Sequence, residues 1–506
     1  MPAYIQSAGL TGICGFGVQV EVDASKGMPA FEIVGLPDAA IKESKERVRA
    51  ALLNTGMNFP MRRIIVNLSP ADVPKNGALY DLPILLGLLS ATEQLSFNEN
   101  AMVLGQLSLS GQVLSIHGAL PLVRYAQQNG ISAVYLPEGN TDEVKHITDI
   151  AIFPVRSVAQ FIAHINGTER IEPLRPQPFA PDSAEGDADF SEVMGQTVAR
   201  RALEIAAAGG HNILLIGPPG SGKSMLAKRF PTILPDMTYE EAVESTEIYS
   251  VSTKGETHKL ISRRPFRSPH HTASTVALCG GGIHLTPGEI SLAHGGVLFL
   301  DEFPEFPPKM LEALRQPLED NIITVARAAG SVTYPANFIL LAAMNPCPCG
   351  YLGHSEKECT CSPAAIDRYH RRISGPILDR IDMHIDVPAV QYKDISSRKK
   401  AEDSASIRAR VNAARKIQQE RFAHLPINKN ADMSGKDIKE FCTTDTEGEK
   451  LLQLKFEDKS LSARGYTRIL KVARTIADLA GEQNILSCHI GEALQYRISN
   501  GKYKLE

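Results

Sequence analysis

The chain has 506 residues, with 53 Lys and Arg against 57 Asp and Glu, and a formal net charge of -4. This charge excludes a uniformly basic nucleic-acid binder, so any contact with nucleic acid would need a local basic patch. No apolar run reaches the ~18 to 20 residues that a membrane span requires. Such a length is typical of two to four domains, each able to bury its own core.

The cysteines and the first residues indicate the compartment. Cys14, Cys279, Cys442 and Cys488 are scattered along the chain, a distribution that does not fit a secreted disulfide framework. The opening stretch MPAYIQSAGLTG lacks the basic and apolar regions of a secretory signal. We therefore expect a cytoplasmic protein.

A proline-rich linker divides the chain. Residues 170–189, RIEPLRPQPFAPDSAEGDAD, hold four prolines and an acidic end. They predict a first domain over 1–168 and a linker over 169–189. The apolar stretch 84–91 of the first domain is expected to be a buried element.

Beyond the linker, short apolar strands alternate with helices, which indicates an α/β domain over 190–392. A helix is expected at 196–210, and strands at 212–216, 296–301 and 338–345. From about 393 the pattern is charged and helical. Ser404 is the expected cap of a helix whose apolar face carries Ile407, Val411 and Ala414, and a further helix is expected at 463–480.

A phosphate-binding loop follows the first of these strands. The segment GPPGSGKS fits G-x-x-x-x-G-K-[ST] and lies where a strand ends and a helix begins. The glycines allow backbone N–H groups to surround phosphate oxygens, the lysine supplies positive charge, and the last serine can bind Mg²⁺. The expected nucleotide-binding residues are Gly217, Pro218, Pro219, Gly220, Ser221, Gly222, Lys223 and Ser224.

Polar residues end the next two strands. The stretch GGVLFLDE places Asp301 and Glu302 at the end of an apolar strand. An aspartate there suits Mg²⁺ and a glutamate suits the activation of water. Asn345 ends the following strand and could orient that water. Each has a plainer reading, as solvated strand ends or a turn-forming Asn-Pro.

These motifs resemble the AAA+ ATPases, and more closely the magnesium-chelatase-like ComM/YifB family. The similarity is carried by GQTVARRALEIAAAGGHNILLIGPPGSGKS, RPFRSPHHTAS, PGEISLAHGGVLFLDE, NPCPCG and RISGPILDRID. It implies a P-loop α/β core over 190–392, a helical lid over 393–506, ATP and Mg²⁺ as cofactors, and a homo-oligomeric ring, usually a hexamer. It also implies that Arg380 is the finger reaching a neighbour's phosphate, and that Arg464, or else Arg468, is the lid arginine called sensor 2.

The first domain resembles the Lon protease domain, through PKNGALYDLP (74–83) and residues 105–140. The resemblance implies an α+β fold of the Lon-protease and ribosomal-protein type. By register, Leu79 stands where the nucleophilic serine belongs and Leu120 where the lysine belongs. A leucine offers neither nucleophile nor base, so the domain is expected to be inactive as a peptidase.

A basic segment is the candidate grip on DNA. Residues 253–271 carry five Lys or Arg and one acid, Glu256. A solvated loop is the plain reading, whereas basic residues on phosphates would give the sequence-independent grip of a motor. A hairpin around Gly330 is a second candidate. The histidine pair 270–271 is not expected to hold a metal, because adjacent side chains usually diverge. The DNA-binding candidates are Lys259, Arg263, Arg264, Arg267 and Arg327.

Sequence alone supports ATP hydrolysis, and the resemblance adds the substrate. It implies an ATP-dependent DNA helicase or branch-migration factor in homologous recombination during natural transformation, with single-stranded or branched DNA as partner. The alternatives are a motor for magnesium insertion into a porphyrin and an ATP-dependent unfoldase or protease-related protein.

Four cysteines lie directly after Asn345. Cys347, Cys349, Cys359 and Cys361 form the pattern C-x-C-x9-C-x-C. Folded back on itself, the segment could offer four thiolates to a structural Zn²⁺. C-x2-C is the more usual zinc spacing, so reduced packed thiols and a redox-sensitive pair remain open.

Overall fold

A computed structural model describes residues 2–97, 99–182, 188–252, 259–282, 285–327, 330–354, 356–389, 401–457 and 461–497. The chain forms two compact units. The first unit comprises residues 1–180 and 239–262, and the second comprises 181–238 and 263–506. None of the described helices combines the length and the apolar character needed to cross a bilayer.

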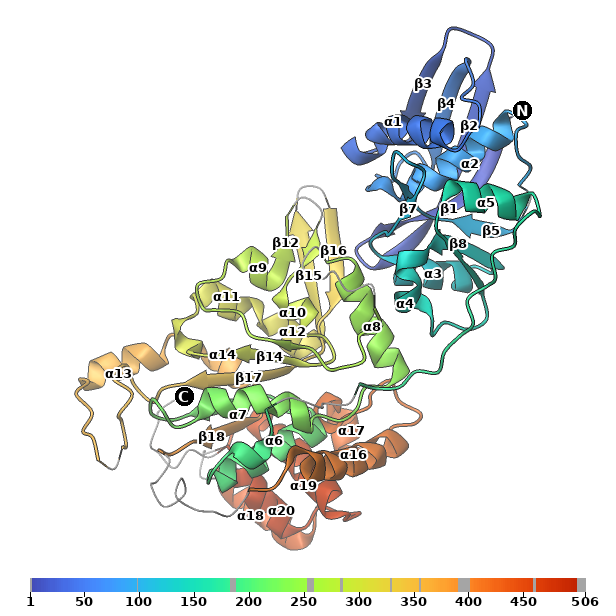
Figure 1. Cartoon of the computed structure of the whole chain (residues 1–506). Coiled ribbons are helices and arrows are strands. Elements are labelled where there is room, and N and C mark those ends of the chain that lie inside the picture. Colours follow the sequence, from blue (N-terminus) through green and yellow to red (C-terminus); the bar gives the residue numbers. More distant parts are fainter. Residues whose placement is uncertain are drawn as a thin grey trace. The chain divides into compact units, whose positions relative to one another are not determined.

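The first unit is built on a seven-stranded mixed sheet in the order β3-β4-β2-β1-β5-β8-β9 (Figure 1). Helix α2 packs on β1 and β2, and nearly all of its side chains are buried, as expected for the apolar stretch 84–91. The strands are β1 (Ala3–Thr11), β2 (Cys14–Ser25), β3 (Ala30–Val34), β4 (Arg63–Ser69), β5 (Ala101–Val103), β8 (Ala133–Pro137) and β9 (Ala151–Val155), with a small pair β6 (Gln106–Leu107) and β7 (Val113–Leu114). The helices are α1 (Ala39–Asn54), α2 (Asp81–Ala91), α3 (Ala119–Gln128), α4 (Thr141–Val144) and α5 (Val158–Ile165).

Helix α8 (Tyr239–Ser250) also belongs to the first unit, although it lies within the range expected for the α/β core. Val243 enters the hydrophobic core of the first unit. Arg124 of α3 forms an ion pair with Glu247 at 2.9 Å, and the N–H of Gly118 donates to the carbonyl of Ser250. The expected continuous core is therefore interrupted, because residues 239–262 find their apolar partners in the first unit.

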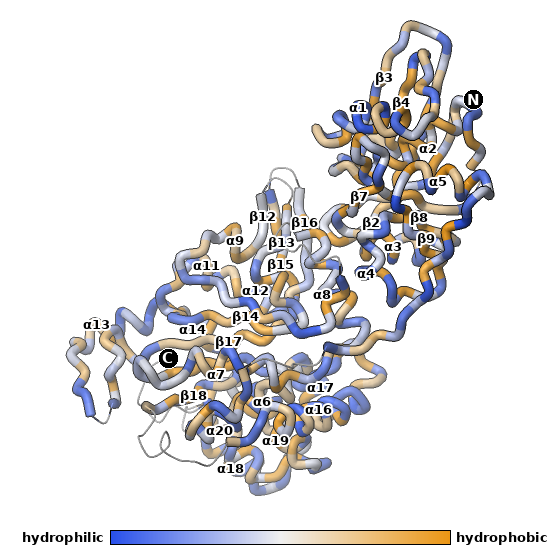
Figure 2. The backbone as a smooth tube through the Cα atoms, in the orientation of Figure 1, coloured by the Kyte–Doolittle hydropathy of each residue, from blue (hydrophilic) through white to orange (hydrophobic). Residues whose placement is uncertain are grey.

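The second unit contains a five-stranded parallel sheet in the order β11-β14-β17-β10-β18. The expected strands appear within two residues of their expected ends, and β14 and β17 are coloured as hydrophobic in Figure 2. The strands are β10 (Ile213–Ile216), β11 (Phe266–Arg267), β14 (Val297–Leu300), β17 (Ile339–Met344) and β18 (Met383–Asp386). The helices around them are α6 (Thr197–Gly209), α7 (Lys223–Arg229), α9 (Thr275–Cys279), α10 (Glu289–Leu292), α11 (Pro308–Ala313), α12 (Arg315–Asp320), α13 (Pro363–His370) and α14 (Gly375–Leu378).

Two small hairpins belong to the second unit. The expected hairpin around Gly330 is present: β15 (Ile322–Arg327) pairs antiparallel with β16 (Gly330–Pro335), with Arg327 opposite Gly330. The second hairpin joins β12 (Gly280–Gly281) to β13 (Thr286–Pro287).

The C-terminal part is helical: α16 (Ser404–Arg421), α17 (Gly435–Phe441), α18 (Thr446–Glu457), α19 (Ala463–Ala480) and α20 (Ser487–Gln495). Ile407, Val411 and Ala414 are buried, as expected. The expected cap is wrong by one residue. Asp403 accepts from the N–H of Ser406, whereas the Ser404 hydroxyl accepts from the N–H of Phe190 and contacts Thr232.

Candidate nucleotide-binding site

The phosphate loop connects β10 to α7. Gly220 and Gly222 have φ of 75° and 90°, in the left-handed region that favours glycine. A Cβ on Gly217 would lie 2.2 Å from the carbonyl oxygen of Val387. All three glycines are thus required by the path of the loop, which turns from the buried strand into the N-terminus of α7.

The polar groups of this loop point inward. Lys223 Nζ donates to the carbonyls of Gly217 and Pro218 at 2.7 and 3.0 Å, and to Asn345 Oδ1 at 3.3 Å. Burial lowers the pKa of Lys223, while the charge of Asp301 opposes that shift. The buried hydroxyl of Ser221 has no hydrogen-bond partner among the described residues. A lysine folded over a glycine-rich loop and a buried hydroxyl without a partner are the features of a site that binds a polyphosphate chain.

The acidic residues complete the site. Ser224 Oγ donates to Asp301 Oδ2 at 2.6 Å, so the two expected Mg²⁺ ligands already lie together. When bound there, Mg²⁺ would neutralise phosphate charge. Glu302 follows with φ of 52°, a left-handed conformation that costs a non-glycine residue roughly 1–2 kcal/mol. Its carboxylate is 58% exposed, and its N–H donates to Asp301 Oδ1. Strain at an exposed acid beside a phosphate loop is typical of a catalytic position.

The four clustered cysteines converge beside this loop. Their sulfur atoms all lie within 4.8 Å of one another. The Sγ–Sγ distances are 3.4 Å for Cys347–Cys349 and 3.6 Å for both Cys347–Cys359 and Cys349–Cys359. Hydrogen bonds, the strongest of them from the backbone N–H of Tyr351, lower the pKa of Cys349 to about 6. Four sulfurs with Zn–S bonds of about 2.3 Å would be roughly 3.8 Å apart in a tetrahedron, so this cluster needs little adjustment to hold zinc.

The loop that carries these cysteines, residues 346–362, is called the cysteine loop below. It also contacts the phosphate loop. A Cβ on Gly350 would lie 2.5 Å from Cδ of Pro219. On the other side, His370 Nε2 lies 2.9 Å from the carbonyl oxygen of Pro346. The backbone carrying the cysteines therefore packs directly on the nucleotide-binding loop.

The expected interface arginines differ in their surroundings. The side chain of Arg380 is 10% exposed and pairs with Glu319, while its Nη1 donates to the carbonyl of Pro376. That pairing lowers the pKa of Glu319. Arg464 is 62% exposed and lies 3.6 Å from Asp379, whereas Arg468 pairs with the buried Asp382. Of the two lid candidates, Arg464 is the more accessible.

The expected DNA-binding residues divide into two groups. The guanidinium of Arg264 donates to the carbonyls of Pro235, Asp236 and Gly295, and Arg267 pairs with Glu289 at 2.6 Å. These two side chains hold segments of the second unit together. Lys259, Arg263 and Arg327 are exposed. Residues 253–258, which carry Glu256 of the basic segment, lie outside the described residues.

Comparison with known proteins gives the family. Family models match residues 20–140 (subunit ChlI of Mg-chelatase), 189–395 (magnesium chelatase, subunit ChlI) and 401–497 (the ChlI C-terminal region). The chain is 42% identical over 488 residues to the competence protein ComM of Haemophilus influenzae, covering 95% of this chain and 94% of that protein. It is 42% identical over 483 residues to the uncharacterized protein YifB of Escherichia coli, with the same coverage. The chain belongs to the magnesium-chelatase-like ComM/YifB family. It is therefore an AAA+ ATPase, whose cofactors are ATP and Mg²⁺.

This ComM/YifB chain also has a partial similarity to a protease. It is 25% identical over 174 residues to the Lon protease of Mycolicibacterium smegmatis, which is 32% of this chain and 22% of that protein. Leu79 and Leu120 are both buried apolar side chains. Lys75 is also fully buried, and its Nζ donates to the carbonyl of Pro70. Neither leucine can act as nucleophile or base.

One polar neighbour of the site was missed from the sequence. His271 Nδ1 lies 3.1 Å from Glu302 Oε2. The rings of His270 and His271 are 4.2 Å apart, so the expectation that these adjacent side chains diverge is wrong. The contact could have been predicted from the position of His271, because His271 follows strand β11 and β11 pairs with the strand that ends before Asp301.

Proposed function

We propose that the chain is an ATP-driven motor on single-stranded or branched DNA, acting as a helicase or branch-migration factor in recombination during natural transformation. The nucleotide site supplies hydrolysis, and a relative that matches over 94% of its own length carries the name competence protein. The observation that carries the DNA step is the β15–β16 hairpin, whose exposed Arg327 lies opposite Gly330. We place this activity in the cytoplasm.

Arg327 is the residue through which DNA contact is tested. Removing an exposed arginine that contacts a DNA phosphate reduces the slope of log K against log salt concentration by about one. The preference for particular DNA sequences does not change. We expect Arg327→Glu to reduce DNA-stimulated ATP hydrolysis severalfold while the rate without DNA stays as in the wild type. Hydrolysis is measured with and without branched DNA at several salt concentrations.

The matched control is Lys439→Glu, an equal charge reversal on an exposed residue of α17. Equal losses in both variants would show a general charge effect and would remove the hairpin from DNA binding. Stimulation of ATP hydrolysis by a porphyrin with Mg²⁺, and not by DNA, would favour the magnesium-insertion alternative. The names of the matching family models suggest that alternative. Stimulation by an unfolded protein would favour the unfoldase alternative.

We further propose a homo-oligomeric ring, probed as a hexamer, in which Arg380 reaches a neighbour's nucleotide and Arg464 acts from the lid. Arg380 would have to leave Glu319 to do so, because its side chain is nearly buried in this arrangement. Domain bounds of 1–168, 190–392 and 393–506 remain our proposal, with residues 239–262 packed on the first unit.

We also propose that Cys347, Cys349, Cys359 and Cys361 hold one structural Zn²⁺. Protein purified without a metal-affinity column is expected to contain about one zinc per chain, and the double variant Cys359→Ser, Cys361→Ser to contain none. Because the cysteine loop packs on Pro219, zinc removal is expected to weaken ATP binding. Less than half an equivalent of zinc in the wild type would contradict the proposal and leave reduced or redox-active thiols.

A further inference from the structure

Two loops meet at one end of the sheet of the first unit. Residues 26–29 join β2 to β3, and residues 55–62 join α1 to β4 (Figure 1). In the strand registers, Arg63 of β4 lies opposite both the last residue of β2 and the first residue of β3. The N–H of Ala30 also donates to the carbonyl of Arg62 at 3.4 Å. The two loops and Arg63 therefore form one surface, which we call the basic tip.

The basic tip carries exposed positive charge. Neither loop contains an acidic residue. Lys26 and Arg62 are exposed and have no acidic partner among the described residues. Arg63 is 52% exposed, and its guanidinium lies 3.8 Å from the carboxylate of Glu32, which is itself 54% exposed. An ion pair between two such exposed groups is weak and leaves the guanidinium open to another anion. The surface thus offers three cations to an anionic partner.

Large apolar side chains are exposed beside these charges. Met28 is 88% exposed and Met61 is 74% exposed, more than any other large apolar side chain among the described residues. Phe59 of the second loop packs against Phe31, with ring centroids 6.1 Å apart, and the guanidinium of Arg49 lies 5.2 Å from the centre of the Phe59 ring. Apolar side chains that stay exposed within a rim of charge mark an interaction surface.

The partner of such a surface must carry both anionic groups and apolar faces. A single strand of nucleic acid carries both, because its phosphates attract lysine and arginine and its unpaired bases present flat aromatic faces. The polarizable thioether of methionine packs favourably against aromatic rings. In a duplex the base faces are stacked inside the helix, so the two methionines would find no partner there. An acidic peptide would match the charges but would leave the methionines exposed.

We propose that the basic tip is a binding surface for single-stranded DNA. Lys26, Arg62 and Arg63 contact phosphates, while the two methionines pack on bases. The inference rests on the DNA partner proposed above and goes beyond the motor activity, because it assigns a function to the unit that lacks the phosphate loop. Phosphate and base-face contacts of this kind do not depend on sequence, and they require no ATP hydrolysis.

The test measures the binding of an oligothymidylate of about 20 nucleotides to the full chain without ATP, over a range of salt concentrations. The double variant Lys26→Ala, Arg62→Ala is expected to bind about 10-fold more weakly at low salt. It should also reduce the slope of log K against log salt concentration by about 1.4, since each phosphate contact on a single strand contributes about 0.7.

The methionines are tested separately from the charges. The double variant Met28→Ser, Met61→Ser is expected to weaken binding about 3- to 10-fold without changing the salt slope, because it removes base contacts and no charge. A duplex of the same length should bind the wild type more weakly than the single strand does. Unfolding temperatures equal to that of the wild type show that the variants keep their fold.

The matched control is the double variant Arg170→Ala, Arg175→Ala, which removes two exposed cations from the same unit. These residues flank Leu174, whose N–H donates to the carbonyl of Ile152 in β9, at the opposite edge of the sheet from β3. The control should bind the single strand as the wild type does. Equal losses in the control and in the Lys26 and Arg62 variant would show a general charge effect and would overturn the inference.

Three further results would overturn the inference: wild-type affinity in either variant of the basic tip, equal affinity for single strand and duplex, or binding to phosphatidylglycerol vesicles without binding to DNA. The ATPase rate separates the inference from the proposed motor. If DNA does not change that rate but the tip variants lose the single strand, the motor proposal fails and the binding surface stands. If DNA raises the rate and the tip variants bind normally, only the binding surface fails.

Discussion

Asp382 is a buried charge that joins the sheet to the lid. It precedes β18 and pairs with Arg468 of α19, while its Oδ2 accepts from the N–H of Asn212 at 2.9 Å. Burial alone would raise its pKa, but Arg468 and the nearby His211 hold the pKa of Asp382 well below its ordinary value. Breaking one side of a buried ion pair usually costs about 3–5 kcal/mol, because the other charge is left unpaired.

We therefore predict that Asp382→Asn destabilises the second unit by about 3 kcal/mol at pH 7. A carboxyl with a lowered folded-state pKa stabilises the fold above its unfolded pKa of about 3.9, and this contribution is lost as the pH falls below that value. The difference between wild type and variant should accordingly shrink below about pH 4, measured by urea denaturation. A constant difference across the pH range would contradict the assignment. Asp367→Asn, which breaks an exposed pair with Arg371, is the control and should cost under about 1 kcal/mol.

At the scale of single residues, the sequence predicts contiguous motifs but not contacts between residues that are far apart in the chain. The phosphate loop could be placed because its glycines, lysine and serine are contiguous in the sequence. Arg264 was interpreted as a possible DNA contact, yet its three carbonyl partners come from residues 235, 236 and 295. The contact of His271 with Glu302 depends on a two-residue strand that periodicity cannot reveal.

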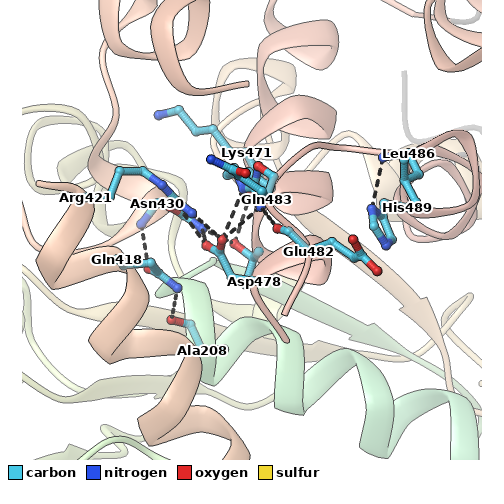
Figure 3. Close-up of polar contacts among 12 residues, drawn as sticks. Ala208, Gln418, Arg421, Asn430, Lys471, Asp478, Glu482, Gln483, Leu486 and His489 are labelled. Carbon is cyan, nitrogen blue, oxygen red and sulfur yellow. Dashed lines mark hydrogen bonds and ion pairs between the residues drawn. The ribbon is translucent and has the colours of Figure 1, made fainter. Parts of the chain in front are cut away.

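The lid helices are joined by one polar network around Asp478, shown in Figure 3. Asp478 is buried in α19 and accepts from Arg421 of α16, from Arg474 one turn earlier, and from Asn430 Nδ2 at 2.8 Å. Gln418 extends the network, because its Nε2 donates to the carbonyl of Ala208 at 3.1 Å. That carbonyl belongs to the last turn of α6, which leads into β10 and the phosphate loop. The lid is thus tied to the end of a core helix.

We predict that Asp478→Ala destabilises the lid by roughly 3–5 kcal/mol, since it leaves the buried guanidinium of Arg474 and the half-buried one of Arg421 without their carboxylate. The matched control is Glu482→Ala, two residues beyond the end of the same helix. There Arg474 bonds the backbone carbonyl, which the substitution preserves. Thermal unfolding of the two variants measures the difference. Similar decreases in the unfolding temperature of both variants would show that the Asp478 network contributes little to the stability of the lid.

At the scale of elements, periodicity located the strands of the parallel sheet and the long lid helices. The expected helix 463–480 coincides with α19. The partner of α8 could not be predicted, because its apolar residues are satisfied by the first unit, far away in sequence. Helical patterning identifies a buried face, but it does not say which domain buries it.

The whole chain alternates between its two units three times, at residues 180–181, 238–239 and 262–263. Leu79 and Leu120, where the Lon resemblance would place the catalytic pair, are buried in the first unit, and the phosphate loop lies in the second. Residues 239–262 lie between the phosphate loop and Asp301 in sequence, and they pack on the first unit. Residues 239–262, which interrupt the ATPase sequence, are therefore part of the first unit. Experiments on this protein should for this reason use the full chain and not isolated parts.

The central claim is that hydrolysis at Glu302 is coupled to DNA. The most direct measurement is the steady-state ATPase rate of the full chain, with and without branched DNA, for the wild type and for Glu302→Gln. We predict a wild-type rate that rises severalfold with DNA and falls back with added salt. Glu302→Gln should bind ATP and hydrolyse it at least about 100-fold more slowly under both conditions. A wild-type rate indifferent to DNA at every salt concentration, or a Glu302→Gln variant as fast as the wild type, would contradict the account.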